Sequence, residues 1–143
     1  MLTKNGRKWL GSGTTNTPGS ITYKDINGDS KTISPQNITT TSRVVIGTGS
    51  TLEAADDYKM ESEVPDGVER TTTSYSNAKD NFIIQYTANF TNNTGKAVTV
   101  KEIGLQCKYN SGASEISILT YRKTIDPVKI PAGGIKTFTV ALI

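Results

Sequence analysis

The stretch NFIIQYTANFTNNTGKAVTVKEIGL, residues 81–105, decides the fold class that the sequence predicts. From Phe82 to Phe90, apolar residues stand at even positions and polar residues at odd positions, with Ile83 as the exception. This period of two is typical of a β-strand that buries one of its faces. The Asn-, Thr- and Gly-rich residues 92–96 then predict a turn, because Gly and Asn adopt positive φ at low cost.

A second strand is predicted after this turn, and its apolar residues change phase part of the way along. Val98 and Val100 stand at even positions, whereas Ile103 and Leu105 stand at odd ones. One extra residue near positions 101–102 would produce this change, as a β-bulge does. We therefore expect a long antiparallel hairpin at the centre of a β-sheet.

The rest of the chain consists of short β-prone runs separated by turn signals. Asn27-Gly28 lies between the runs 21–24 and 31–33 and is a strong hairpin signal. Residues 38–48 predict one long strand. The further predicted elements are one helical turn at 52–57, strands at 58–61, 68–76 and 135–143, and a strand at 115–122 that is either an inner strand or covered by a partner. The pattern predicts an all-β fold, an antiparallel β-sandwich or jelly-roll-like arrangement.

The length of 143 residues is usual for one domain. Residues 11–20 hold only Gly, Ser, Thr, Asn and Pro, so residues 1–20 are predicted to form an extended N-terminal arm or linker. Residues 21–143 are predicted to form a single β-sandwich domain. Within the arm, residues 7–10 predict a short strand that carries Trp9. This side chain either folds back on the core or docks on a neighbouring molecule, because Trp is enriched in interfaces.

The composition is poor in charge. Charged residues make up 20% of the chain, and the formal net charge of +3 is too weak to predict nucleic-acid binding, which needs a clustered basic face. No secretory signal is recognisable at the N-terminus, and no segment approaches the roughly 20 apolar residues that span a membrane. We expect synthesis in a cytoplasm and no nucleic-acid or membrane partner.

The residue types that most catalytic and metal sites need are missing. The sequence has no histidine and one cysteine, which excludes Ser-His-Asp and Cys-His arrangements and the usual zinc ligand sets. Cys107 continues the apolar phase of its strand and predicts a buried hydrophobe. Gly47-Thr48-Gly49 lacks the rest of a phosphate-binding fingerprint and is interpreted as the end of a strand. We expect no cofactor, no metal and no catalytic residue.

A group of acidic residues is the one set that could act as the paired carboxylates of a glycosidase. Its members are Glu53, Asp56, Asp57, Glu61 and Glu63. They cluster in a predicted turn region, where carboxylates are simply solvated. We therefore expect that the protein is not an enzyme.

Six tyrosines, spread among predicted strands and loops, give another hypothesis. Aromatic side chains exposed on a β-sandwich can bind sugars. The simpler interpretation places Tyr86 and Tyr121 in the core and the other tyrosines at edges. The residues that we predict for an interface with a neighbouring molecule are Trp9, Tyr58 and Met60.

Several segments resemble small virion proteins of tailed bacteriophages. That family carries a Gly-Thr-Gly segment, a short spacer and an Asp-Tyr-x-Leu-Glu-like piece, followed later by characteristic turns and strands. The corresponding segments here are residues 44–49, 56–61, 90–95, 100–105 and 130–133. The pattern covers residues 44–143, with Met60 where Leu is usual and no prolines in the spacer. The resemblance implies a structural role in the virion.

Three hypotheses follow. The first is a structural component of a phage virion, associated with capsid decoration, neck, tail or fibre, that acts by assembly with other virion proteins as a homo-oligomer. The alternative is a carbohydrate- or receptor-binding module that contacts a host surface glycan through exposed tyrosines. The third is a small lytic enzyme, which only the acidic group of residues supports.

Overall fold

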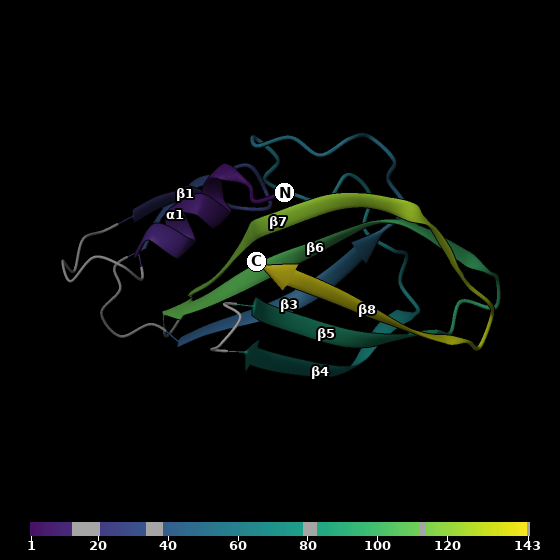
Figure 1. Cartoon of the computed structure of the whole chain (residues 1–143). Helices are drawn as coiled ribbons and strands as arrows, with labels where there is room; N and C mark the ends of the chain where they lie inside the picture. The colour runs from purple at the N-terminus through teal and green to yellow at the C-terminus, as the bar shows by residue number, and fades with distance from the viewer. Residues whose placement is uncertain (13–20, 34–38, 79–82, 112–113, 143) are drawn as a thin grey trace.

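The computed structural model describes residues 1–12, 21–33, 39–78, 83–111 and 114–142 (Figure 1). It is mainly β with antiparallel pairing, which confirms the predicted all-β class. The elements are α1 (Lys4–Ser12), β1 (Ile21–Lys24), β2 (Ser30–Ile33), β3 (Thr39–Gly47), β4 (Val68–Ala78), β5 (Ile83–Asn92), β6 (Val98–Ser111), β7 (Ser114–Ile130) and β8 (Ile135–Leu142).

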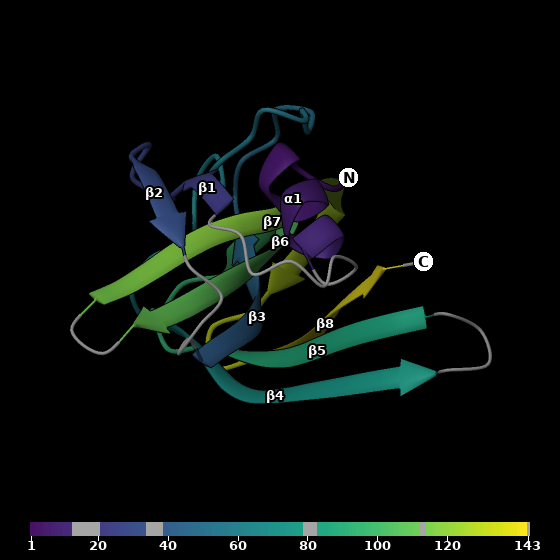
Figure 2. The ribbon, with the colours of Figure 1, turned by 90° about the vertical axis from the view of Figure 1, so that its left-hand side faces the viewer.

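Two three-stranded sheets form the body of the molecule, with strand orders β3-β6-β7 and β4-β5-β8. Figure 2 shows the two sheets facing each other, with α1, β1 and β2 on the far side of β6 and β7. The inward residues of both sheets share one apolar core, because strands with one buried face must cover it. Its buried members are Val44, Ile46, Ala88, Phe90, Val100, Ile103, Leu105, Ile130, Phe138 and Val140.

The predicted hairpin of residues 81–105 is wrong. β5 and β6 belong to different sheets, and residues 93–97 carry the chain from one sheet to the other. Sheets that face each other lie about 10 Å apart, a distance that this segment spans easily. The alternation itself is confirmed, since Ala88 and Phe90 are buried and Gln85 is exposed. Each strand also lies at the centre of its own sheet.

Asn92 fixes this crossing. Its side chain is fully buried, and its Nδ2 donates hydrogen bonds to the carbonyl oxygens of Lys96 (2.7 Å) and Ile130 (2.9 Å). Its backbone N–H donates to Gly134 (2.9 Å), and its carbonyl accepts from the N–H of Gly133 (2.7 Å). Since residues 131–134 carry the chain back between the sheets, Asn92 joins both crossings.

The predicted bulge is confirmed, because the pairing of β6 with β7 shifts between Val100 and Glu102. The shift keeps Ile103 and Leu105 in the core and turns Glu102 and Gln106 to the outer face. Those outer residues are nevertheless buried, at 0% and 1% exposed. The outer face of this sheet is therefore covered by other parts of the chain.

The N-terminal segment supplies part of this cover. The predicted strand at 7–10 is wrong, because residues 4–12 form α1, and residues 1–12 pack against the domain instead of forming an extended arm. Thr3 caps the helix, with its Oγ1 accepting from the N–H of Gly6 at 3.0 Å. A Cβ at Gly6 would overlap the carbonyl of Thr120 on β7, so this glycine allows the close contact. The remaining arm residues, 13–20, lie outside the described residues.

The segment between β3 and β4 supplies the rest of the cover. The helical turn predicted at 52–57 and the strand predicted at 58–61 are both wrong, since residues 48–67 form an irregular loop. We call it the covering loop. It touches β3 through an isolated bridge between Glu63 and Gly47. Its backbone polar groups bond to buried side chains, described below, in place of a regular ladder.

β7 differs from its prediction in position and length. It is an edge strand of its sheet, so the first of its two predictions, an inner strand, is wrong. Ile118 and Leu119, on its opposite faces, are both buried within the chain. β7 also runs through Pro127 to Ile130. Proline lacks an N–H, which an edge strand tolerates near a bulge. The β1–β2 hairpin, the long β3, the exposed edge strand β4 and the last strand β8 are confirmed.

Candidate interaction surfaces

A buried ion-pair cluster anchors the covering loop to the outer face of β6 and β7. Arg122 is 2% exposed and Glu102 is fully buried. Arg122 Nε donates to Glu102 Oε2 at 2.7 Å, and Nη1 donates to Asp57 Oδ2 at 2.8 Å. Nη2 donates to the carbonyl of Thr51 at 2.8 Å and lies 3.6 Å from Glu61 Oε2. We call these five residues the Arg122 cluster.

The cluster is saturated with partners. Besides Arg122, Glu102 accepts from the backbone N–H groups of Glu61 (3.2 Å) and Ser62 (2.8 Å). Burial alone would lower the pKa of Arg122, but hydrogen bonds to Asp57 and Glu102 outweigh it and raise the pKa. The charges stabilise each other, so the cluster holds a loop in place.

Gly47 and Gly49 make room for the carboxylates of the Arg122 cluster. A Cβ at Gly47 would overlap Glu102 Oε1, and a Cβ at Gly49 would overlap Glu61 Oε2. Both positions therefore need glycine so that the carboxylates can approach the backbone. The sequence showed Gly47-Thr48-Gly49 only as a strand end, because the residues that touch it lie far along the chain.

The other acidic residues of the loop are also engaged. Glu53 accepts from the N–H and the hydroxyl of Thr124, and these bonds lower its pKa to about 2. Hydrogen bonds from the hydroxyl and N–H of Thr51 lower the pKa of Glu61. A general acid needs a raised pKa, so both shifts run opposite to that chemistry.

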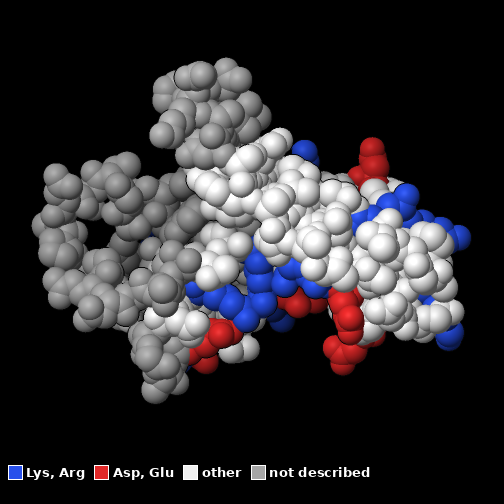
Figure 3. Space-filling model, turned by 90° about the horizontal axis from the view of Figure 1, so that it is seen from below, with Lys and Arg blue, Asp and Glu red and all other residues white. Residues whose placement is uncertain are grey.

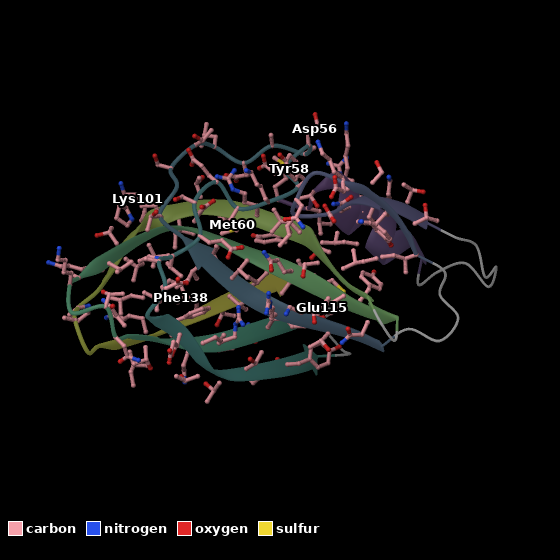
Figure 4. The ribbon with its side chains drawn as sticks, turned by 180° about the vertical axis from the view of Figure 1, so that it is seen from behind. Asp56, Tyr58, Met60, Lys101, Glu115 and Phe138 are labelled. Carbon is pink, nitrogen blue, oxygen red and sulfur yellow. The ribbon has the colours of Figure 1, made fainter. Side chains whose placement is uncertain are left out.

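The residues predicted for an interface differ in exposure where the structure describes their side chains. Met60 is 3% exposed and packs on Val45 and Leu119, beneath the covering loop. Tyr58 is half-buried, with Lys24 Nζ 4.1 Å from its ring centre. Figure 4 shows Tyr58 and Asp56 at the rim of the molecule and Met60 further in, against the sheet. Trp9 lies in α1, and its side chain is outside the described part of the structure.

A pocket of about 270 Å³ opens beside the covering loop. Asp56, Tyr58, Met60 and Arg122 contribute to its lining. The guanidinium of Arg122 already donates to three partners and also lies 3.6 Å from Glu61 Oε2, so its charge is balanced within the chain. This pocket follows from the anchoring of the loop.

The outer face of β4-β5-β8 has a different character. The buried residues of β5 and β8 point to the core, so the residues between them face outward. We call this surface the uncharged face. Its residues are Thr72, Ser74, Ser76, Gln85, Thr87, Asn89, Thr137, Thr139 and Ala141.

Hydrogen bonds across the strands order the uncharged face. The hydroxyls of Thr87 and Thr139 are bonded to each other at 3.0 Å, and Thr137 Oγ1 donates to Asn89 Oδ1 at 2.5 Å. Figure 3, viewed from below, shows a broad uncharged area above a band of charged residues. The sequence held a signal for this face, namely uncharged residues at the polar positions of β5, which the prediction did not use.

One pair of tyrosines is accessible. Tyr75 on β4 is 57% exposed, and its ring centre lies 5.2 Å from that of the half-buried Tyr86 on β5. Tyr86 and Tyr121 are half-buried and pack against the apolar core, as expected, whereas Tyr23 and Tyr109, which were expected at edges, are buried at 3% and 7% exposed. The rings of Tyr23 and Tyr109 pack β1 onto β6.

Among the described residues, no helix has the length and apolar character needed to cross a membrane. Comparison of the chain with known protein families, curated proteins and solved structures gives no match.

Proposed function

We propose that the protein is a structural component of a tailed-phage virion, a jelly-roll-like β-sandwich that acts by assembly through its uncharged face. The observation that carries the proposal is this face, whose nine named residues extend over three strands without a charged side chain, with Glu69 as the first charge beyond them. Removing a charge from water costs far more than removing a hydroxyl or amide that keeps its hydrogen bonds. The cores of protein interfaces are accordingly depleted of charge.

The phage-like segments support the proposal from another direction. The Gly-Thr-Gly segment receives the anchored covering loop, and residues 130–133 make the turn into β8. The first segment therefore shapes the covered sheet, and the second leads into the sheet whose outer residues would meet a neighbour. Copies related by closed symmetry would bury the face, in capsid decoration or in the neck, tail or fibre.

The test places a charge on the uncharged face. Thr87→Glu is compared with Thr22→Glu, since Thr22 forms the same kind of hydroxyl pair with Thr32 on the β1–β2 hairpin, at 2.9 Å. We expect sedimentation velocity to show an oligomer for the parent and for Thr22→Glu, and a monomer for Thr87→Glu. Crosslinking mass spectrometry on purified virions should place the uncharged face against a neighbour. A monomeric parent that is absent from virions would refute the proposal.

The tyrosine pair favours a second candidate function, binding of a host surface glycan. Tyr75 and Tyr86 offer an accessible aromatic surface of the kind that sugars stack on. A glycan array should give hits that Tyr75→Ala abolishes and that Thr22→Glu retains. An array without hits would count against this function.

A further inference from the structure

The free edge of β8 is unlike the other edges of the two large sheets. Residues 1–3 bond to β7, with Leu2 bridging Tyr121. Glu63 and Val64 bond to the end of β3. Exposed sheet edges invite pairing with other chains, so proteins normally cover or interrupt them.

β4 is interrupted as well, by a bulge between Arg70 and Thr72. β8 pairs with β5 over eight consecutive residues without a shift in register, and its sequence contains no proline. Nothing in the described parts of the chain pairs with its other edge. β8 therefore presents a regular, unoccupied row of backbone donors and acceptors.

A groove of about 460 Å³ runs along this edge. On one side it is lined by Tyr121, Ile125 and Val128 of β7, which are only partly buried although they pack on the apolar core. On the other side it is lined by Phe138 and Val140 of β8. The edge of the apolar core is thus only partly covered between β7 and β8.

The groove reaches the backbone of β8. Thr137, Thr139 and Ala141 line it together with Phe138 and Val140, although the two groups point to opposite faces of the sheet. Residues of both faces can line one groove only where it passes the strand edge between them. An extended segment in this groove could pair with β8 and bury its own alternate side chains on the core.

The arrangement of the sheets leaves room for one strand. β3 lies across from β5 and β6 across from β8, so β7 extends beyond β8 and covers the space next to it. A second copy that paired its β8 with this β8 about a two-fold axis would keep its covering sheet on the same side. Its β7 would then occupy the space of this molecule's β6. The groove therefore excludes that dimer and fits a single segment.

Charge defines the segment further. Lys123 is the one charged residue in the lining, on β7 opposite Ile103. An inward-pointing charge at a sheet edge rejects purely apolar strands, and it favours a segment that carries an opposite charge there. We propose that the groove binds one extended segment of another polypeptide, which adds to β8 as a strand, with apolar residues at alternate positions and a carboxylate facing Lys123.

Two blocked peptides of eight residues, the length of β8, test the proposal. Both alternate Val and Thr, and one has Glu and the other Lys at a central inward position. In ¹⁵N NMR titrations we expect the Glu peptide to shift the amide signals of residues 137–141 and to bind at least about tenfold more tightly than the Lys peptide. Lys123→Glu should reverse the preference.

The matched control is Lys129→Glu, an exposed lysine of the same strand that does not line the groove. It should leave the preference unchanged. The proposal is overturned if neither peptide shifts the β8 amides, if the two peptides bind equally, or if Lys129→Glu acts as Lys123→Glu does. Thr87→Glu should still bind the Glu peptide, so this result does not depend on the assembly role proposed above.

Discussion

The outer faces of the two large sheets differ, because one is covered by other parts of the chain and the other is bare. The outer face of β3-β6-β7 is covered by the covering loop and the N-terminal segment, while the β1–β2 hairpin bonds to β7 and packs on Cys107, Tyr109 and Ile118. The outer face of β4-β5-β8 carries no cover within the described chain, and its residues are uncharged apart from Glu69 near the start of β4. The polar residues beneath the cover are ionised and paired, as in Arg122 with Glu102, whereas those of the bare face are hydroxyls and amides.

The difference shows what each face is built to meet. A fixed cover can satisfy buried charges permanently, because the same chain supplies every partner. A face that meets another molecule must remain stable in water and still lose water at low cost, which neutral hydroxyls and amides allow. The following predictions test this contrast from its largest expected effect to its smallest.

The largest effect is expected under the cover. Arg122→Ala would leave Glu102 buried without its counter-charge, and we expect the free energy of unfolding to fall by about 3–5 kcal/mol. Urea unfolding measures the loss. Arg122→Met combined with Glu102→Gln removes both charges, keeps an acceptor for the N–H groups of Glu61 and Ser62, and should recover part of the loss. A double variant as unstable as the single one would show that the loss does not come from leaving Glu102 without its counter-charge.

Removal of an apolar contact under the cover should cost less. Met60→Ala deletes a side chain that packs on Val45 and Leu119, and we expect a loss of about 2–3 kcal/mol in the free energy of unfolding. Leu52→Ala is the control, because Leu52 lies in the same loop and is 78% exposed. Equal losses for the two variants would contradict the packing described here.

Gly104→Ala tests how closely Met60 packs against the backbone of β6. The new Cβ would lie 2.7 Å from Met60 Sδ and 2.9 Å from the carbonyl of Tyr121, so we expect overpacking to cost about 1–2 kcal/mol. The cost should shrink in a Met60→Ala background, which a double-mutant cycle measures. If Gly104→Ala costs the same in both backgrounds, the strain comes from the carbonyl of Tyr121 alone.

Acid should weaken the covered face and not the bare one. Glu53 has a pKa of about 2 in the folded protein against 4.5 for an unperturbed Glu, so its stabilising effect is present above pH 4.5 and is lost as the pH falls toward 2. Because Glu53 is only partly buried, we expect less than about 1 kcal/mol. Glu53→Gln should flatten thermal-unfolding profiles over this range. A profile identical to that of the parent would exclude this carboxylate as the cause.

The smallest effect is expected on the bare face. Thr87→Val with Thr139→Val removes an exposed hydroxyl pair and keeps the β-branched shape, so the free energy of unfolding should change by less than about 0.5 kcal/mol. Thermal unfolding of the isolated chain measures it. A large loss would mean that the hydroxyl ladder stabilises the fold itself.

The sequence was sufficient for the features that depend on local periodicity. The alternation of β5, the bulge between Val100 and Glu102 and the burial of Cys107 all follow from the order of apolar residues. Periodicity says which face of a strand is buried, but it does not identify the neighbouring strand. Periodicity therefore could not predict that β5 pairs with β4 and β8 and not with β6.

Other features depend on residues that are distant in the chain. α1 contains Gly6 and Gly11, which lower helix propensity, and it is held by the Thr3 cap and by contact with β7. The Arg122 cluster joins residues 51–61 to strands β6 and β7, so no short motif announces it. The uncharged face, by contrast, was readable from the solvent-facing positions of β5 and β8.

The buried amide of Asn92 gives the molecule one closed end. The two turns that cross between the sheets are bonded to each other through this single residue, so the sheets cannot part there without breaking three of its hydrogen bonds at once. Opening of the interior has to begin at the opposite end and progress toward this side chain. We therefore expect the amide protons around residues 92 and 133–134 to exchange with solvent only when the whole molecule unfolds.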